Sequence, residues 1–273
     1  MNYIVAVSGG VDSVVLLDML IKQKEHNLVV AHFDHGIRVD SDADARFVWE
    51  LAKKYELSFE VRREELGDAA SENTARSHRY AFLRDIAKKY SATIVTAHHA
   101  DDVVETIAIN LTRGTGWRGL TVMGDETIRR PLLGLRKQQL YTYALEHQLE
   151  YIEDETNRDH TYTRNHIRQK LSSLLDPDRQ QLLKLRSHQR TLRRAIARET
   201  ERHLLHLDRY FFIMIPEPVA LELLRAHTDA ILTMPQQRYL LERIKTASPG
   251  SVIEPGGNIH VTITAKAFHI EHK

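Results

Sequence analysis

Six consecutive residues near the N-terminus combine glycines, hydroxyls and an acid in an order suited to binding an anion. They are Ser8, Gly9, Gly10, Val11, Asp12 and Ser13. The glycines can take backbone angles closed to other residues and leave room for a ligand, and the serines add hydroxyl donors. Asp12 would repel phosphate unless a Mg²⁺ ion lay between them, which is a usual way for a carboxylate to meet a nucleotide. The six residues predict a binding loop for a nucleotide and magnesium, and a glycine-rich turn without a ligand is the less favoured alternative.

A denser group of polar residues occurs further along the chain, at His98, His99, Asp101, Asp102 and Glu105. Asp102 and Glu105 are three residues apart, so on a helix they share a face. Such a pair could bind the ammonium group of an amine, and one carboxylate could bind Mg²⁺, so that Asp12 and Asp101 are the predicted metal ligands. A dinuclear metal site formed by the histidines is one alternative. Acids that only stabilise a helix N-terminus are the other.

Two further groups of polar residues could border a nucleotide. His32 and Arg38 lie at the end of another apolar run and are expected to frame the nucleotide. Arg76 and Arg79 are one helical turn apart, and their planar guanidinium groups could stabilise charge on phosphate. A solvated helix face explains the spacing of the two arginines nearly as well.

These groups must be positioned by the elements around them. Apolar runs over 4–7, 28–33, 58–61 and 93–97 predict buried strands, and a helical pattern follows each. The alternation predicts an α/β fold, a parallel sheet with helices on both faces, and ligands bind beyond the C-terminal ends of such strands. We expect this catalytic domain to cover 1–130, a helical region to cover 131–207 and a small α+β domain to cover 208–273.

Charge is unevenly distributed in a chain whose formal net charge is only +1. Residues 158–202 hold twelve basic and five acidic side chains, which suggests a polyanionic partner such as RNA, a homodimer partner or a solvated helix face. The chain has no cysteine, which excludes disulfides and thiol chemistry. It has no apolar run long enough to cross a bilayer, so we expect a soluble, cytoplasmic protein with no membrane partner.

Seven motifs occur in one order along the first 170 residues. They occupy Ser8–Ser13, His32–Arg38, Ala75–Tyr80, Thr96–Thr106, Leu111–Leu120, Arg130–Leu133 and Asp154–Arg168. In this order they resemble the tRNA(Ile)-lysidine synthetases, members of the PP-loop ATP pyrophosphatases. The resemblance implies that ATP, with Mg²⁺, adenylates the wobble cytidine in the CAU anticodon of tRNA(Ile). Free L-lysine then attacks C2 of the cytosine and expels AMP.

The resemblance also implies roles for individual residues. The loop at Ser8–Ser13, with His32 and Arg38, would bind ATP, and Asp12, Arg79 and Asp102 would take part in catalysis. Residues implied to contact lysine or tRNA are His98, Asp102, Glu105, Arg113, Asn157, Arg164, Asn165 and Arg168.

Two rival functions remain. A cytidine thiolase would also use a PP-loop, but sulfur transfer by those enzymes relies on cysteine. A non-catalytic RNA-binding relative would gain nothing from buried carboxylates, because burying an unpaired charge is costly. The part of the chain after Arg202 is short for the lysidine family, which leaves open how tRNA is recognised outside the anticodon.

The basic stretch makes one prediction. Replacing Arg190, Arg193 and Arg194 together with Gln should weaken tRNA binding and flatten its salt dependence, because fewer counterions are released. Titration of labelled tRNA at several salt concentrations measures both effects. Unchanged affinity would identify the stretch as a solvated helix face.

Overall fold

The computed structural model describes residues 1–24, 27–34, 36, 41–65, 72–153, 163–171, 173–204 and 208–273, without the side chains of 41, 72 and 163–166. The chain divides into two compact units, Met1–Gln189 and Arg190–Lys273. The three-part division expected from the sequence stays a prediction.

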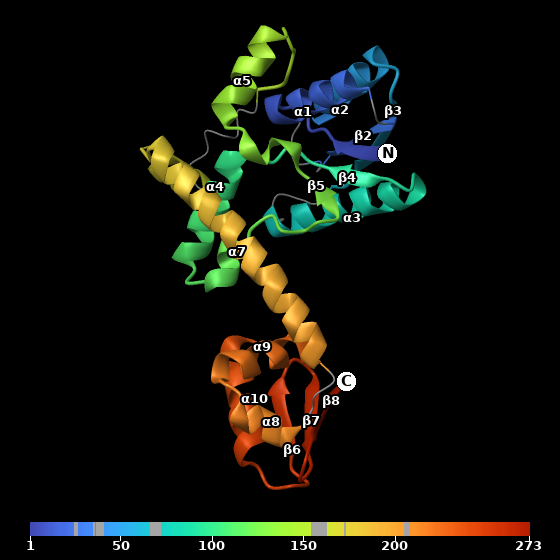
Figure 1. The fold of residues 1–273 in the computed structure, drawn as a ribbon. Helices are drawn as coiled ribbons and strands as arrows, with labels where there is room; N and C mark the ends of the chain where they lie inside the picture. The colour runs from blue at the N-terminus through green and yellow to red at the C-terminus, as the bar shows by residue number, and fades with distance from the viewer. Residues whose placement is uncertain are drawn as a thin grey trace. The chain divides into compact units, whose positions relative to one another are not determined.

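The first unit is organised around a five-stranded parallel sheet (Figure 1). Its strands are β1 (Asn2–Ala6), β2 (Asn27–Asp34), β3 (Ser58–Arg63), β4 (Thr93–Val95) and β5 (Ile128–Arg129), in the order β3-β2-β1-β4-β5. Central strand β1 is in register with both neighbours, so that Ile4 lies opposite Val29 and Ile94. The predicted α/β class is confirmed.

Helices cover both faces of this sheet because successive side chains of a strand point to opposite sides. Helices α1 (Val11–Gln23), α2 (Ser41–Lys54) and α5 (Lys137–Glu146) share one core with Val5. Helix α3 (Glu72–Lys89) shares the other core with Ile4.

The remaining elements of the first unit follow β4. They are α4 (Ala100–Thr112), the 3₁₀ helices η1 (Trp117–Leu120) and η2 (Pro131–Gly134), α6 (Thr163–Leu171) and α7 (Asp176–His203), which continues past Gln189.

The strand order of the sheet changes direction between β1 and β4, and this position is where a ligand is expected to bind. From β1 the chain proceeds to β2 and β3 on one side, and β4 and β5 lie on the other. In open α/β sheets the crevice beyond the C-terminal ends of the two strands at such a switch point is the usual ligand site. Here those strands are β1, which leads to Ser8, and β4, which leads to His98 and His99.

The second unit is a small α+β structure, as expected. It has α8 (Arg209–Met214), α9 (Glu217–His227) and α10 (Met234–Thr246), and an antiparallel sheet of β6 (Val252–Gly256), β7 (Ile259–Ile263) and β8 (Phe268–His272). Phe212 and Phe268 are fully buried in its core and meet edge to face, with ring centroids 4.9 Å apart.

Among the helices described, none is both long and apolar enough to span a bilayer.

Helix α5 is fastened to α1 by a polar contact next to their shared apolar core. The hydroxyl of Tyr143 donates to the buried carboxylate of Asp18 at 2.8 Å, and Lys22 lies 2.8 Å from the same oxygen. Burial, and next the bond to Asp18, raise the pKa of Tyr143, so its hydroxyl stays a donor at neutral pH. This contact sets the place of α5 relative to the helix that follows the Ser8–Ser13 loop.

Removing the hydroxyl should therefore loosen α5. Tyr143→Phe leaves a buried carboxylate short of one donor, and we expect the free energy of unfolding to fall by about 1–2 kcal/mol. Denaturant unfolding measures the change. Tyr141→Phe on the same helix is the matched control, because Tyr141 is 46% exposed. Equal stability of the two variants would contradict this role of Tyr143.

Candidate functional site

The Ser8–Ser13 loop is closed by hydrogen bonds of its own serines. Ser13 Oγ donates to the carbonyl of Gly10 at 2.8 Å and accepts from the backbone N–H of Ser8 at 3.2 Å. The two hydroxyl oxygens are 3.3 Å apart. Gly10 is the N-cap residue of α1 and has no side chain that could cap the helix. The carbonyl of Gly10 also accepts from the N–H of Ser13 at 3.0 Å and of Val14 at 3.1 Å. The N–H groups of the two residues before them, Val11 and Asp12, lie at the very start of α1, where helices bind anions.

Gly9 has a conformation and surroundings that only glycine tolerates. Its φ is +92°, and a Cβ built there would lie 2.6 Å from Cδ1 of Ile152. The chain near Ile152 is fixed at this point, because its N–H donates to the carbonyl of Gly9 at 3.0 Å. A segment that follows α5 therefore packs directly on the loop.

The centre of the site is His99, which immediately precedes α4 and is 5% exposed. Three carboxylates surround its ring. Nε2 lies 3.8 Å from Asp12 and 3.6 Å from Asp102, and Nδ1 lies 3.8 Å from Asp101. Nδ1 is buried and has no hydrogen-bond partner among the described residues. The backbone N–H of His99 donates to Asp102 Oδ2 at 2.9 Å, which fixes that carboxylate beside the ring.

Lys137 places a positive charge in the loop, although the loop has no lysine of its own. Its Nζ lies 2.7 Å from both carboxylate oxygens of Asp12. It reaches them from the first residue of α5, whereas Asp12 is in the first turn of α1. Sequence reasoning missed Lys137, because no motif surrounds it and only the docking of α5 on α1 brings the pair together.

Asp101 belongs to the same turn of α4, but both of its oxygens are already used. Oδ1 accepts from Arg179 Nη1 at 2.9 Å, and Oδ2 accepts from the backbone N–H of Lys137 at 2.8 Å. Among the described residues, no group of three or more histidines and acids has the arrangement of a metal site. A bound Mg²⁺ would thus need phosphate or water oxygens beside Asp12, and Asp101 as a ligand stays a prediction.

Glu105 lies one turn further along α4 and is almost completely buried, at 4% exposed. Arg168 of α6 donates two hydrogen bonds to its carboxylate, from Nε to Oε1 at 2.6 Å and from Nη2 to Oε2 at 3.1 Å. The hydrogen bonds to Glu105 raise the pKa of Arg168, and the charges of Asp102 and Asp12 act in the same direction. The structure therefore brings together Glu105 and Arg168, both of which the resemblance implied.

Two predicted histidines have partners just beyond the ends of strands β1 and β4. His32 is buried, with Nδ1 2.9 Å from the carbonyl of Val7 at the end of β1. His98 Nδ1 lies 2.8 Å from the hydroxyl of Thr96. Both rings thus lie at the C-terminal ends of their strands, where the site is.

The predicted arginines are less closely connected to this centre. Arg79 lies on α3 with its guanidinium 5.7 Å from the ring centroid of Tyr80. Arg113 follows α4 and is exposed. Arg38 and Asn157 lie outside the described residues, as do the side chains of Arg164 and Asn165 on α6.

Comparison with known proteins now connects the site to a family. Residues 1–175 match the model of the PP-loop domain. The chain belongs to the PP-loop family. The match covers the loop, the His99 centre and Arg168, and it supports ATP as the nucleotide of this domain. The Ser8–Ser13 loop is called the PP-loop from here on.

Within the PP-loop family, the chain is similar to curated tRNA(Ile)-lysidine synthases. The chain is 38% identical over 180 residues to the tRNA(Ile)-lysidine synthase of Thermosipho africanus, covering 62% of this chain and 42% of the relative. It is 41% identical over 183 residues to that of Geobacter sulfurreducens, covering 62% and 39%. The resemblance to the lysidine synthetases is thereby confirmed. The chain spans about two fifths of the length of these relatives.

A solved structure shows the same fold. The U34-tRNA thiolase NcsA from Methanococcus maripaludis superposes with a TM-score of 0.59 at 16% identity, covering 70% of this chain and 71% of that one. At this identity the likeness shows the fold alone.

Gly9 of the PP-loop makes a testable prediction. Gly9→Ala forces a Cβ into Ile152 at a positive φ, so we expect a loss of about 1–3 kcal/mol in the free energy of unfolding and weakened ATP binding. Denaturant unfolding and ATP titration measure these. Gly116→Ala is the control, because a Cβ there would meet no described atom within 4 Å. A Gly9 variant as stable as this control would contradict the strain.

Proposed function

We propose that this chain uses ATP to attach free L-lysine to C2 of the wobble cytidine in tRNA(Ile) with a CAU anticodon. The products are lysidine, AMP and pyrophosphate, and an enzyme acting on tRNA would work in the cytoplasm. The observation that carries the proposal is the acidic centre at the sheet's switch point. There His99 lies within 3.8 Å of Asp12 and Asp102, beside a PP-loop.

The PP-loop would bind the phosphates of ATP. Its glycines, its serines and the first N–H groups of α1 would donate to phosphate oxygens, and Lys137 would turn from Asp12 to the same oxygens. Asp12 fits Mg²⁺, because it offers carboxylate oxygens and already attracts a cation. The ion would neutralise charge on the departing pyrophosphate.

The first chemical step would adenylate the base. The carbonyl oxygen at C2 of cytosine attacks the α-phosphorus, the bond between the α-phosphorus and the bridging oxygen breaks, and pyrophosphate leaves. Negative charge develops on the transferred group, and we assign its stabilisation to Lys137 and to Arg79, whose guanidinium lies beside Tyr80. His32 and Arg38 would border the nucleotide.

The second step would attach lysine. The ε-amine, after losing one proton from its ammonium form, attacks C2 and expels AMP. Asp102 is suited to bind the ammonium and accept that proton, because its position is fixed by the N–H of His99. His98 and Asp102 would thus contact the amine.

Glu105 would take part only after a rearrangement. Arg168 occupies its carboxylate in this structure, and both charges are well satisfied. We propose that Arg168 turns to RNA phosphate when tRNA binds, which leaves Glu105 to the lysine ammonium. Arg113, Asn157, Arg164 and Asn165 would contact the same RNA. A homodimer stays an untested prediction.

Pyrophosphate release and mass analysis test the reaction. Purified protein is incubated with ATP, Mg²⁺ and tRNA(Ile) bearing CAU, with and without lysine. We expect pyrophosphate, and a lysine-sized mass increase on the wobble cytidine only when lysine is present. Pyrophosphate without attached lysine would make lysine the wrong nucleophile. Binding of tRNA without ATP cleavage would favour a binding protein.

Two variants test the assigned roles. Asp12→Ala should abolish pyrophosphate release and largely preserve tRNA affinity, because it removes the carboxylate assigned to Mg²⁺. Lys137→Met should slow release by roughly 100-fold or more, because it removes a positive charge assigned to the phosphate oxygens. Asp85→Ala is the control, because Asp85 is exposed and pairs with Arg62 on the surface. Turnover by either variant equal to that of the control would remove that residue from the mechanism.

A further inference from the structure

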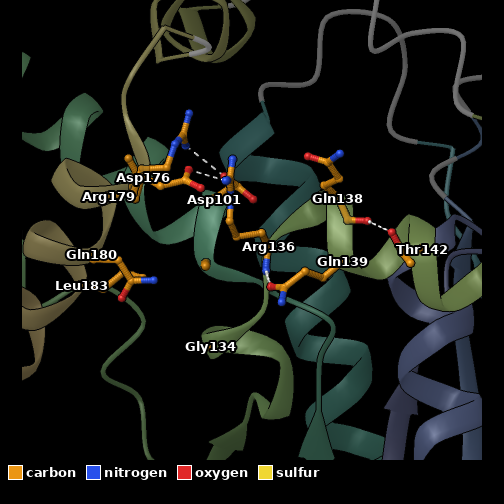
Figure 2. A pocket seen from close by; sticks show the side chains of 12 residues that line it. Asp101, Gly134, Arg136, Gln138, Gln139, Thr142, Asp176, Arg179, Gln180 and Leu183 are labelled. Atoms are coloured by element: carbon orange, nitrogen blue, oxygen red, sulfur yellow. Dashed lines mark hydrogen bonds and ion pairs between the residues drawn. The ribbon is translucent and has the colours of Figure 1, made fainter.

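A cavity of ≈ 520 Å³ lies next to the acidic centre, within the first unit. The first two turns of α4, α5 and α7 border it, together with Gly134 and Arg136 just before α5 (Figure 2). None of the roles assigned above uses this space, although Asp101 lines it.

Opposite charges alternate around the cavity. Arg179 Nη1 donates to Asp101 Oδ1 at 2.9 Å, and Arg136 Nη1 donates to Asp176 Oδ1. Arg136 Nε also lies 4.0 Å from Asp101 Oδ1. Figure 2 shows the four side chains drawn together. The cavity wall thus carries two guanidinium groups and two carboxylates.

Arg136 retains unused binding capacity. Its Nε is buried and has no hydrogen-bond partner among the described residues. Its backbone is fixed, because the N–H of Arg136 donates to Oε1 of Gln139 at 2.8 Å. A buried donor that lacks a partner is costly, so a ligand that accepts from Arg136 would be stabilised.

The charges select the class of ligand. A simple anion such as an RNA phosphate would meet two carboxylates, and a simple cation would meet two arginines. A zwitterion satisfies both, because its carboxylate can accept from the planar forks of Arg136 and Arg179 while its ammonium donates to the exposed carboxylate of Asp176. The head group of a free α-amino acid is such a zwitterion.

We propose that this cavity binds the α-carboxylate and α-ammonium of free lysine, an inference that rests on the proposed function. Asp101 connects the cavity with the reaction centre, since its Oδ2 lies 3.8 Å from His99 Nδ1 and His99 Nε2 lies 3.6 Å from Asp102. An extended lysine places its ε-amine about 6 Å from its Cα, so a head group held in the cavity would direct the amine past Asp101 toward Asp102.

Three ligands test this assignment by equilibrium dialysis with the full chain. L-lysine carries both head groups, cadaverine lacks the α-carboxylate, and 6-aminohexanoate lacks the α-amine. We expect the wild-type protein to bind L-lysine roughly 10- to 100-fold more tightly than either analogue, because each analogue loses charge-assisted hydrogen bonds.

Two variants test which side chain binds the α-carboxylate of lysine and which binds its α-ammonium. Arg136→Gln should weaken L-lysine and 6-aminohexanoate by a similar factor, so that the preference for L-lysine over cadaverine disappears. Asp176→Asn should instead weaken the binding of L-lysine and cadaverine by a similar factor, so that the preference for L-lysine over 6-aminohexanoate disappears. Both variants break the same ion pair, so a merely structural effect would weaken all three ligands alike. Arg238→Gln, which breaks an exposed pair with Glu217, is the control.

The outcomes separate this proposal from the proposed function. If the wild type attaches lysine to tRNA but Arg136→Gln and Asp176→Asn keep wild-type preferences, the cavity is not the head-group site. If Arg136→Gln instead lowers tRNA affinity alone, the cavity binds RNA phosphate. If the wild type neither binds nor attaches lysine, the proposed function itself fails, and the cavity assignment fails with it.

Discussion

The site depends on holding three carboxylates around one buried histidine. Asp12, Asp101 and Asp102 each lie within 3.8 Å of the ring of His99. Like charges at such distances repel, and this repulsion must be offset by nearby cations. Lys137 is bonded to Asp12 and Arg179 to Asp101. Each of these cations comes from a helix other than the one that bears its acid.

Helix α5 supplies much of the positive charge and hydrogen bonding that offset this repulsion, although the helix is short. It begins at Lys137, whose Nζ bonds Asp12 and whose N–H bonds Asp101. It is held by the apolar core around Leu140 and by the bond from Tyr143 to Asp18. A single short helix therefore connects the PP-loop, the acidic centre and the cavity beside them. Any shift of α5 would alter all three, since the polar contacts are short and directional.

Opposed charges at close range also suit a reaction that uses charged substrates. In the proposed reaction, ATP brings negative charge to the PP-loop and lysine brings a cation to the acids. Each substrate would replace a contact that the protein makes with itself in this structure, such as Lys137 on Asp12 or Arg168 on Glu105. Internal ion pairs keep the buried charges satisfied before the substrates arrive, because an unpaired buried charge is costly.

The sequence by itself determined the features that depend on neighbouring residues. The PP-loop was evident because its glycines and serines are consecutive, and the parallel sheet followed from alternating apolar runs. Asp102 and Glu105 could be placed on one face of α4 from their spacing alone. The tertiary structure decided which distant charges meet. Lys137 and Asp12 are 125 residues apart, and Arg179 and Asp101 are 78 apart. No local pattern encodes such pairs, because they arise only when α5 and α7 pack beside α1 and α4. For the same reason the sequence did not predict a role for Arg136, because only the fold places its guanidinium beside Asp101 and Asp176.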